Sequence, residues 1–368
     1  MQPTSLWKVT TTDAKIRLLI VFGGQSAERD VSCLTAAHVL QAVNPDRYEI
    51  LAVGIDKTGQ FVSVDVPDIE DSSPGTEIAP MVPVGVDCVI SELITGPTSD
   101  VETVVFPLLH GPLGEDGTIQ GMLEMADVAY VGAGVLGSAA TMDKAMAKTI
   151  LDAHGIPQTK WVSYFEHETD ITSMAADAVE AVGLPCFVKP ANMGSSIGVS
   201  KASNTQELTA ALAEAFRYDE VIVVEEAVVA REIEFAVLGN NDPELSVPGE
   251  IKPGADFYNY EDKYFDGTAE LAIPASLPTS TVEQMRTIAL ATYKALRVEG
   301  LARADFLFEE GGRGPLLNEL NTIPGFTPIS MYPKLWEASG LRYSTLIDRL
   351  VGLALERHRR RSTKRAAS

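Results

Sequence analysis

The chain has 368 residues, of which 45% are hydrophobic and 22% are charged, so it is long enough for two or three globular domains. Its formal net charge of −22 disfavours binding to nucleic acid or to an anionic membrane. The three cysteines, Cys33, Cys88 and Cys186, form no CxxC pair, which predicts reduced thiols in a cytoplasmic protein and no zinc site. We find no apolar run of membrane-spanning length and no signal-peptide pattern at the start.

Buried strands alternate with helical patterns in the first part of the chain. Residues 16–24 and 101–111 are apolar runs that end in glycine, and a helical pattern follows the first of them from Ser26. This alternation predicts a parallel α/β sheet up to about residue 140. The segment 64–100, rich in Pro, Ser, Gly and acidic residues, is expected to be mostly loop with a short strand.

After residue 140 the pattern changes to mixed strands and helices. Residues 185–190 and 197–202 bracket a Gly–Ser loop and predict an antiparallel pair, and 301–310 with 314–321 predict a hairpin. The last helix is expected at about 339–357, followed by a basic tail in solvent. The predicted parts are an N-terminal α/β domain and two α+β subdomains, at 1–140, 141–226 and 227–368.

A glycine pattern at Gly132–Gly137 matches G-x-G-x-x-G, the pattern of dinucleotide-binding turns. It stands late in its α/β unit, and no convincing βαβ unit follows it. We therefore favour a tight strand-to-helix turn. An NAD(P)-dependent oxidoreductase remains the alternative from a different class of enzyme.

A second glycine cluster follows Lys189, in Gly194-Ser195-Ser196-Ile197-Gly198. Such a loop can fold over a triphosphate, because glycines let the backbone N–H groups approach closely. The lysine on the preceding strand would supply a positive charge. Considered alone, the loop is equally well interpreted as an ordinary hairpin turn.

An acidic cluster late in the chain suggests a metal site. Asp305 lies within an apolar run, and Glu319 and Asn321 lie two residues apart on the facing strand of the predicted hairpin. Their oxygens are the ligands that Mg²⁺ prefers, together with phosphate. A solvated strand face is the alternative, but an unpaired carboxylate in an apolar run would be costly.

Loops beside these strands complete the candidate site. The segment 324–328 could present a backbone N–H to an oxyanion beside Arg303. The polar and aromatic segment 258–264 is expected to fold over the site as a lid. Glu28 and His110 each follow the carboxyl end of a strand, where ligands bind in open α/β sheets. A plain loop, an exposed linker and a structural histidine are the respective alternatives.

Together these residues resemble the D-alanine–D-alanine ligases of the ATP-grasp superfamily. The matching segments lie in the family order between about residues 20 and 331: GGQSAERDVS, HGPLGEDGTIQG, MDK, VKPANMGSSIGVS, EEAVVAREIE, FYNYEDKY, RADF and NELNTIPGFTPIS. The second, fourth and last segments in combination are highly specific. The resemblance implies an α/β ATP-grasp fold, with two subdomains that clamp ATP behind the N-terminal domain.

The resemblance also implies roles for individual residues. Those expected to contact ATP are Lys144, Lys189, Ser196, Glu225, Val228, Glu232 and Lys263. Those expected to hold two Mg²⁺ ions, which Mn²⁺ can replace, are Asp305, Glu319 and Asn321. Those expected to contact the two D-alanine molecules are Glu28, His110 and Ser330. Those expected to act in catalysis are Arg303 and Gly325 as an oxyanion hole, and Glu28, Ser195 and Tyr264 as a hydrogen-bonded triad.

By this resemblance we expect a cytoplasmic, homodimeric ligase that joins two D-alanine molecules through an acyl phosphate, for peptidoglycan precursor synthesis. A ligase for another acceptor, such as D-lactate, is the main alternative, and Tyr264 argues against it. A catalytically inactive nucleotide-binding protein is a third alternative. The complete set of lysines and metal ligands argues against that one.

Overall fold

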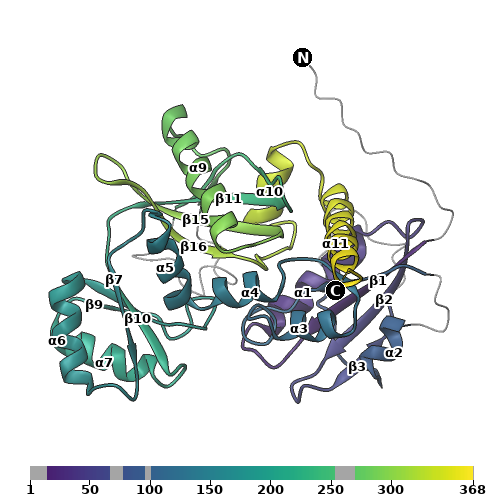
Figure 1. The fold of residues 1–368 in the computed structure, drawn as a ribbon, viewed down its shortest axis with the longest axis horizontal. Coiled ribbons are helices and arrows are strands. Elements are labelled where there is room, and N and C mark those ends of the chain that lie inside the picture. Colours follow the sequence, from purple (N-terminus) through teal and green to yellow (C-terminus); the bar gives the residue numbers. More distant parts are fainter. Residues whose placement is uncertain (1–14, 67–77, 96–100, 253–269, 368) are drawn as a thin grey trace.

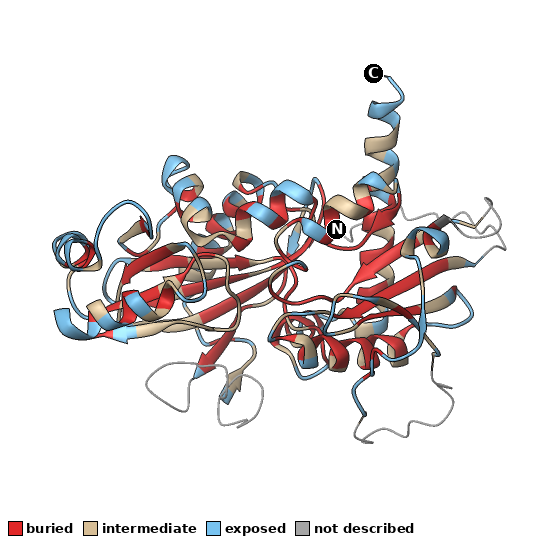
Figure 2. Cartoon of the chain, turned by 90° about the horizontal axis from the view of Figure 1, so that it is seen from below, coloured by how far each residue is buried: buried red, intermediate tan, exposed pale blue. Residues whose placement is uncertain are grey.

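A computed structural model describes residues 15–66, 78–95, 101–252 and 270–367 of the chain. They form three β-sheets, arranged along the molecule, with helices packed on them (Figure 1). The strands are mostly buried, and exposed residues gather on the outer faces of the helices (Figure 2). None of the helices in these residues has the length and apolar character needed to cross a membrane.

The first sheet has the strand order β4-β3-β2-β1-β5-β6. β1 lies in the middle of the sheet and is hydrogen-bonded to β2 on one side and to β5 on the other. Strands β1, β2, β5 and β6 are parallel, as predicted, whereas β3 and β4 add an antiparallel edge. β3 follows β2 through a short turn, and such a turn can join only antiparallel neighbours. The elements are β1 (Ile16–Gly23), α1 (Arg29–Ala42), β2 (Tyr48–Ile55), β3 (Phe61–Val64), β4 (Val86–Asp87), α2 (Ile90–Thr95), β5 (Thr103–Pro107), α3 (Thr118–Met125), β6 (Ala129–Tyr130) and α4 (Val135–Met142).

The second sheet is antiparallel, in the order β7-β10-β8-β9. It confirms the predicted pairing of the two strands that bracket the Gly–Ser loop. Helices α6 and α7 are preceded by the N-cap residues Asp170 and Asn204, whose side chains accept hydrogen bonds from backbone N–H groups of the first turn. The elements are α5 (Lys144–Ala153), β7 (Trp161–Phe165), α6 (Ile171–Val182), β8 (Cys186–Pro190), β9 (Ser200–Ala202), α7 (Thr205–Ala215) and β10 (Val221–Glu226).

The third sheet has the order β14-β13-β11-β15-β16, with β12 paired to β11. The predicted hairpin is confirmed as β15 and β16, with an irregularity between Asp305 and Phe306 that breaks the regular alternation of side chains. The elements are β11 (Arg231–Gly239), β12 (Glu244–Leu245), β13 (Gly249–Lys252), β14 (Glu270–Ala272), α9 (Thr279–Ala295), β15 (Gly300–Glu309), β16 (Gly314–Asn321), α10 (Met331–Ala338) and α11 (Tyr343–Arg365).

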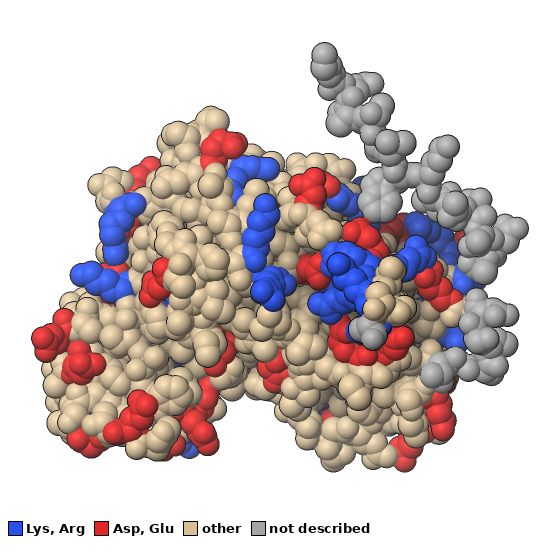
Figure 3. All heavy atoms as spheres, in the orientation of Figure 1, with Lys and Arg blue, Asp and Glu red and all other residues tan. Residues whose placement is uncertain are grey.

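The basic end of the chain corrects one expectation. It is not a solvated tail: α11 continues to Arg365 and packs against β5 and β6 of the first sheet. Its arginines form a positive cluster beside acidic side chains (Figure 3), with Arg361 and Arg365 both paired to Glu124. Arginine is a good helix former, and the acidic partners, distant in sequence, hold the helix in place.

Arg357 fixes the turn that follows β6. Its guanidinium is buried, stacks on the Tyr130 ring at 4.2 Å, and donates to the carbonyl oxygens of Tyr130 and Gly132. Gly132 has a φ of 100°, which favours glycine, and α4 begins three residues later. The Gly132–Gly137 segment is therefore a tight strand-to-helix turn, as favoured from the sequence.

Arg357→Met is expected to lower the free energy of unfolding by about 2–4 kcal/mol, because two buried carbonyl groups lose their donor. Arg359→Met is the matched control, since Arg359 is exposed and pairs with the exposed Glu102. Such a surface pair contributes less than about 1 kcal/mol. Urea denaturation of both variants measures the difference. Equal losses in the two variants would contradict the role of Arg357.

Candidate active site

Glu28 lies where the first sheet meets the Gly–Ser loop. The residue is buried between β1 and α1, and its Oε1 accepts a hydrogen bond from the Ser195 hydroxyl. A Cβ at Gly111 or at Gly194 would lie 2.6 Å or 2.7 Å from Glu28 Oε2, closer than such atoms can approach. Glycine at these two positions lets both loops pack closely around the carboxylate.

His110 lies next to this carboxylate and is held by Glu115. The Nδ1 of His110 is 3.7 Å from Glu115 Oε1, which also accepts a hydrogen bond from the Gly111 N–H. Burial lowers the pKa of His110, but the nearby carboxylates of Glu115 and Glu28 outweigh it, so the pKa is raised. The imidazole can thus carry a positive charge beside Glu28.

The Gly–Ser loop has an unusual backbone. Ser195 and Ser196 have φ values of 47° and 60°, which are uncommon for residues with a side chain. The Nζ of Lys144, at the first residue of α5, donates to the carbonyl oxygen of Met193 at 2.6 Å. This contact joins the start of α5 to the loop.

A second cluster surrounds Glu225 at the end of β10. Lys189 Nζ lies 3.0 Å from its Oε1, whereas Lys148 Nζ lies 3.2 Å from Oε2. The Thr159 hydroxyl donates to Oε2 at 2.8 Å. Burial raises the pKa of Glu225, but Lys148 and Lys189 outweigh that effect and lower the pKa to about 2. The carboxylate is therefore ionised in the interior.

These lysines line a cleft between the second and third sheets. Lys144 and Glu319 of β16 both line this cleft. Burial lowers the pKa of Lys144, and the charge of Glu319 opposes that effect. The lining residues come from α4, α5, β8, β10, the end of α9, and β16: Thr141, Lys144, Ala147, Lys148, Leu151, Lys189, Glu225, Leu296, Asn318, Glu319 and Leu320. A cleft with lysines on one side and a carboxylate on the other suits a phosphate chain and its metal ions.

The predicted metal ligands lie across the β15–β16 hairpin. Asp305 is paired in register with Glu319, and Arg303 with Asn321. Their oxygens are hard donors, and two carboxylates with one amide are too few to enclose an ion without phosphate, which is how proteins usually hold Mg²⁺. No group of three His, Cys, Asp or Glu side chains gathers as a metal site in the described ranges. The donor set therefore fits Mg²⁺ only together with a bound phosphate.

Arg303 is a cation on the β15 strand of this hairpin, beside the predicted metal ligands. Its Nε and Nη2 donate to Asp305 at 2.8 Å and 2.6 Å, and its Nε lies 3.1 Å from Glu234 of β11. Burial lowers its pKa, but Asp305 and Glu234 outweigh burial and raise the pKa well above the ordinary value. Arg303 thus stays charged, and one of its partners is a predicted metal ligand.

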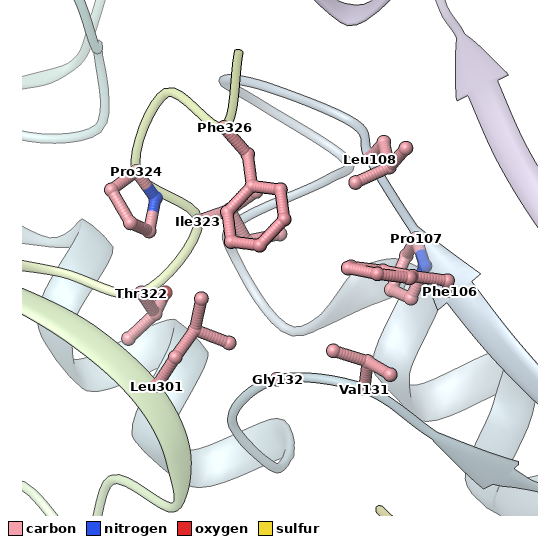
Figure 4. Close-up of a pocket in the computed structure, with 10 residues that line it drawn as sticks. All are labelled: Phe106, Pro107, Leu108, Val131, Gly132, Leu301, Thr322, Ile323, Pro324 and Phe326. Atoms are coloured by element: carbon pink, nitrogen blue, oxygen red, sulfur yellow. The ribbon is translucent and has the colours of Figure 1, made fainter. Parts of the chain in front are cut away.

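The loop that carries Gly325 is held by apolar packing on the first sheet (Figure 4). The ring of Phe326 meets Phe106 of β5, with a distance of 5.9 Å between centroids. Further along the same loop, immediately before α10, the Ser330 hydroxyl lies 2.8 Å from the Thr327 hydroxyl. The N–H groups at the start of this helix can bind a carboxylate.

The remaining predicted residues are less informative. Val228 lies just after β10 and Glu232 lies at the start of β11, and both residues are half-buried. The segment 258–264, with Lys263 and Tyr264, lies outside the described residues. Several charged or polar side chains that contact the predicted ones were not predicted from the sequence: Glu115, Lys148, Thr159 and Glu234. Lys148 could have been found, because it lies one helical turn after Lys144.

Family comparisons cover most of the chain. The family described as D-ala D-ala ligase N-terminus matches residues 17–133, and D-ala D-ala ligase C-terminus matches 150–352. A D-alanine–D-alanine ligase of Thermoanaerobacter sp. (strain X514) is 46% identical over 353 residues, which are 94% of this chain and 98% of that protein. The ligase of Geobacillus thermodenitrificans (strain NG80-2) is 46% identical over 356 residues, 94% and 96% of the two chains.

Solved structures share the fold over nearly the whole chain. The D-alanine–D-alanine ligase of Coxiella burnetii superposes with a TM-score of 0.79 at 32% identity, covering 96% of this chain and 97% of that one. The VanG D-Ala:D-Ser ligase of Enterococcus faecalis has a TM-score of 0.77 at 32% identity, covering 92% and 99%. The three-sheet arrangement is therefore the ATP-grasp fold that the sequence predicted.

Proposed function

We propose, from the premise that this chain belongs to the D-alanine–D-alanine ligase family, that it is an ATP-dependent enzyme joining two D-alanine molecules. The product would serve as a precursor of peptidoglycan. Similarity at 46% identity extends over 94% of this chain and 98% of the Thermoanaerobacter relative.

The position of Glu28 is the observation that carries this proposal. A buried carboxylate between two glycine-containing loops, next to His110, is suited to hold the ammonium group of an amino acid. Ser195 connects it to the loop that follows Lys189, so the amino acid would lie beside the phosphates of ATP. A carboxylate substrate next to a γ-phosphate is the arrangement that an acyl phosphate requires.

In the proposed reaction, the carboxylate of the first D-alanine attacks the γ-phosphate of ATP, forming an acyl phosphate and ADP. The amine of the second D-alanine then attacks the acyl carbon, and phosphate leaves. Lys144 and Lys189 neutralise charge on the phosphates, and Arg303 with the Gly325 N–H stabilises the oxyanion. Ser330, at the start of α10, holds the carboxylate of the second substrate. The segment 258–264 with Lys263 and Tyr264 is proposed to exclude water.

The nucleotide and metal contacts follow the same proposal. Glu225 and the backbone near Val228 bind adenine, Glu232 binds the ribose, and Ser196 binds phosphate. Two Mg²⁺ ions, replaceable by Mn²⁺, are held by Asp305, Glu319 and Asn321, and they supply positive charge to the phosphates. We further propose a homodimer in the cytoplasm, on the strength of the family resemblance.

Phosphate release from ATP tests this proposal. We expect release with D-alanine and none above background with L-alanine. Because one structural relative is a D-Ala:D-Ser ligase, D-serine and D-lactate are supplied as competing second substrates with D-alanine. Mass spectrometry then identifies the product. A mixed product in preference to D-alanyl-D-alanine would replace the proposed acceptor, and no nucleotide turnover with any of these compounds would remove the ligase function.

A further inference from the structure

Two lysines on one face of α5 have different surroundings. Lys144 and Lys148 are four residues apart, so both point toward the cleft between the sheets. Lys144 reaches the Gly–Ser loop, whereas Lys148 is 3% exposed and contacts Glu225 and Thr159. Neither the resemblance nor the proposed reaction gives Lys148 a role, and a buried lysine needs a carboxylate to keep its charge.

The two oxygens of Glu225 are used differently. Oε2 is occupied from the protein interior by Lys148 at 3.2 Å and the Thr159 hydroxyl at 2.8 Å. Oε1 is paired with Lys189, whose side chain is 17% exposed on the side of the cleft. Lys189 is also a proposed phosphate contact. When it moves toward phosphate, Oε1 becomes available to a ligand while Oε2 stays fixed.

We infer that Lys148 is a positioning residue that fixes Glu225 as an ionised hydrogen-bond acceptor, and thereby sets the preference for a 6-aminopurine over a 6-oxopurine nucleotide. This inference rests on the proposed function, in which Glu225 meets adenine. An ionised carboxylate can only accept hydrogen bonds. It accepts from the amino group of adenine and repels the carbonyl oxygen of hypoxanthine or guanine.

The charges around Glu225 explain why Lys148 matters. Lys144 and Lys148 approach it from α5 and Lys189 from β8, and Asp152 acts on Lys148 in turn. Burial raises the pKa of Glu225, and the lysines together hold that pKa at about 2. With Lys148 removed and Lys189 drawn to phosphate, burial would raise the pKa toward neutrality. A protonated Glu225 can donate to a 6-oxo group, so the discrimination would be lost.

Binding of ADP and IDP, without D-alanine, tests the inference by isothermal titration. The wild-type protein is expected to bind ADP more tightly than IDP, and Lys148→Met is expected to reduce this ratio at least tenfold. In this variant the affinity for ADP should fall as the pH is lowered from 8 to 5.5, because protons compete for Glu225. The wild-type affinity should show no such loss from Glu225, whose pKa is far below this range. Lys148→Arg, which keeps the charge, should retain most of the discrimination.

Lys201→Met is the control, since it removes an exposed lysine from β9 of the same sheet and should change neither ratio nor pH profile. A comparison of Glu225→Gln with Glu225→Gln/Lys148→Met avoids leaving a buried carboxylate without its lysine. These two proteins should have equal ratios, because Lys148 acts through Glu225. If loss of Lys148 changes the ratio equally in both backgrounds, or not at all in either, the inference is overturned. Failure of the wild-type protein to bind ADP would instead count against the proposed nucleotide site.

Discussion

Glu319→Gln is expected to slow D-alanine-dependent phosphate release by at least about 10²-fold, since even the outer partners of metal ligands typically contribute 10- to 100-fold. Glu319 lies opposite Asp305 across the hairpin and lines the same cleft as Lys144. Glutamine has nearly the same volume but no charge. The proposed ion loses a ligand, whereas the core keeps its packing.

Two measurements separate metal loss from damage to the fold. Thermal unfolding of Glu319→Gln should match the wild-type protein, and Mn²⁺ binding in the presence of an ATP analogue should weaken. Glu309→Gln is a suitable control, because Glu309 is on the same hairpin and pairs with Arg313 away from the cleft. Near-normal turnover of Glu319→Gln at low millimolar Mg²⁺ would remove this residue from the proposed metal site.

The fold was largely predictable because most of its helices and strands have recognisable local sequence patterns. β1 is an apolar run ending in two glycines, and β8 and β9 bracket a loop of small residues. In both cases the pattern and the turn chemistry lie within a few residues. The short strand expected within 64–100 is β4, but β3 and the antiparallel pairing at this edge were not predicted, since strands of two and four residues carry little periodicity.

The end of the chain shows where local patterns fail. The segment from Arg357 to Arg365 has the composition of a solvated tail, but its acidic partners, such as Glu124 and Asp127, lie more than 200 residues earlier. Nothing in the basic segment itself indicates those partners. Only the packing of α11 against β6 brings the charges together, so the sequence could not reveal the contact.

The candidate site was predicted unevenly for the same reason. Among the residues in glycine loops and at strand ends, Glu28 and Ser195 are hydrogen-bonded to each other, as the resemblance implied, whereas Lys189 pairs with Glu225. Their individual roles remain predictions. Partners such as Lys148 and Thr159 lie outside any motif, and they matter because the three-dimensional structure brings them to a buried carboxylate. Residues that act through other residues are thus the ones that sequence patterns miss.

Arg303 is the second site where we expect a large effect. Within the described part of the chain, Nε and Nη2 are engaged with carboxylates, whereas Nη1 makes no hydrogen bond. A guanidinium cannot act as a base at neutral pH, but Nη1 can donate to an oxyanion. Because Asp305 is a proposed metal ligand, Arg303 would lie beside the reacting acyl group. The competing interpretation is a salt bridge that merely holds Asp305 and Glu234.

Arg303→Ala is therefore expected to reduce kcat by about 10²–10³, the usual cost of losing one oxyanion donor. ATP affinity should change much less, because the phosphates are held by the lysines. Arg303→Lys should restore activity only in part, since an ammonium lacks the planar fork of donors.

Arg303→Ala also leaves two buried carboxylates without this cation, so thermal unfolding must be measured alongside turnover. If Arg303 only holds Asp305, the defect should appear in the Mg²⁺ dependence, and excess Mg²⁺ should restore kcat. Full rescue by Mg²⁺ would refute the oxyanion role, whereas a kcat that stays low at saturating Mg²⁺ in a folded variant would support it.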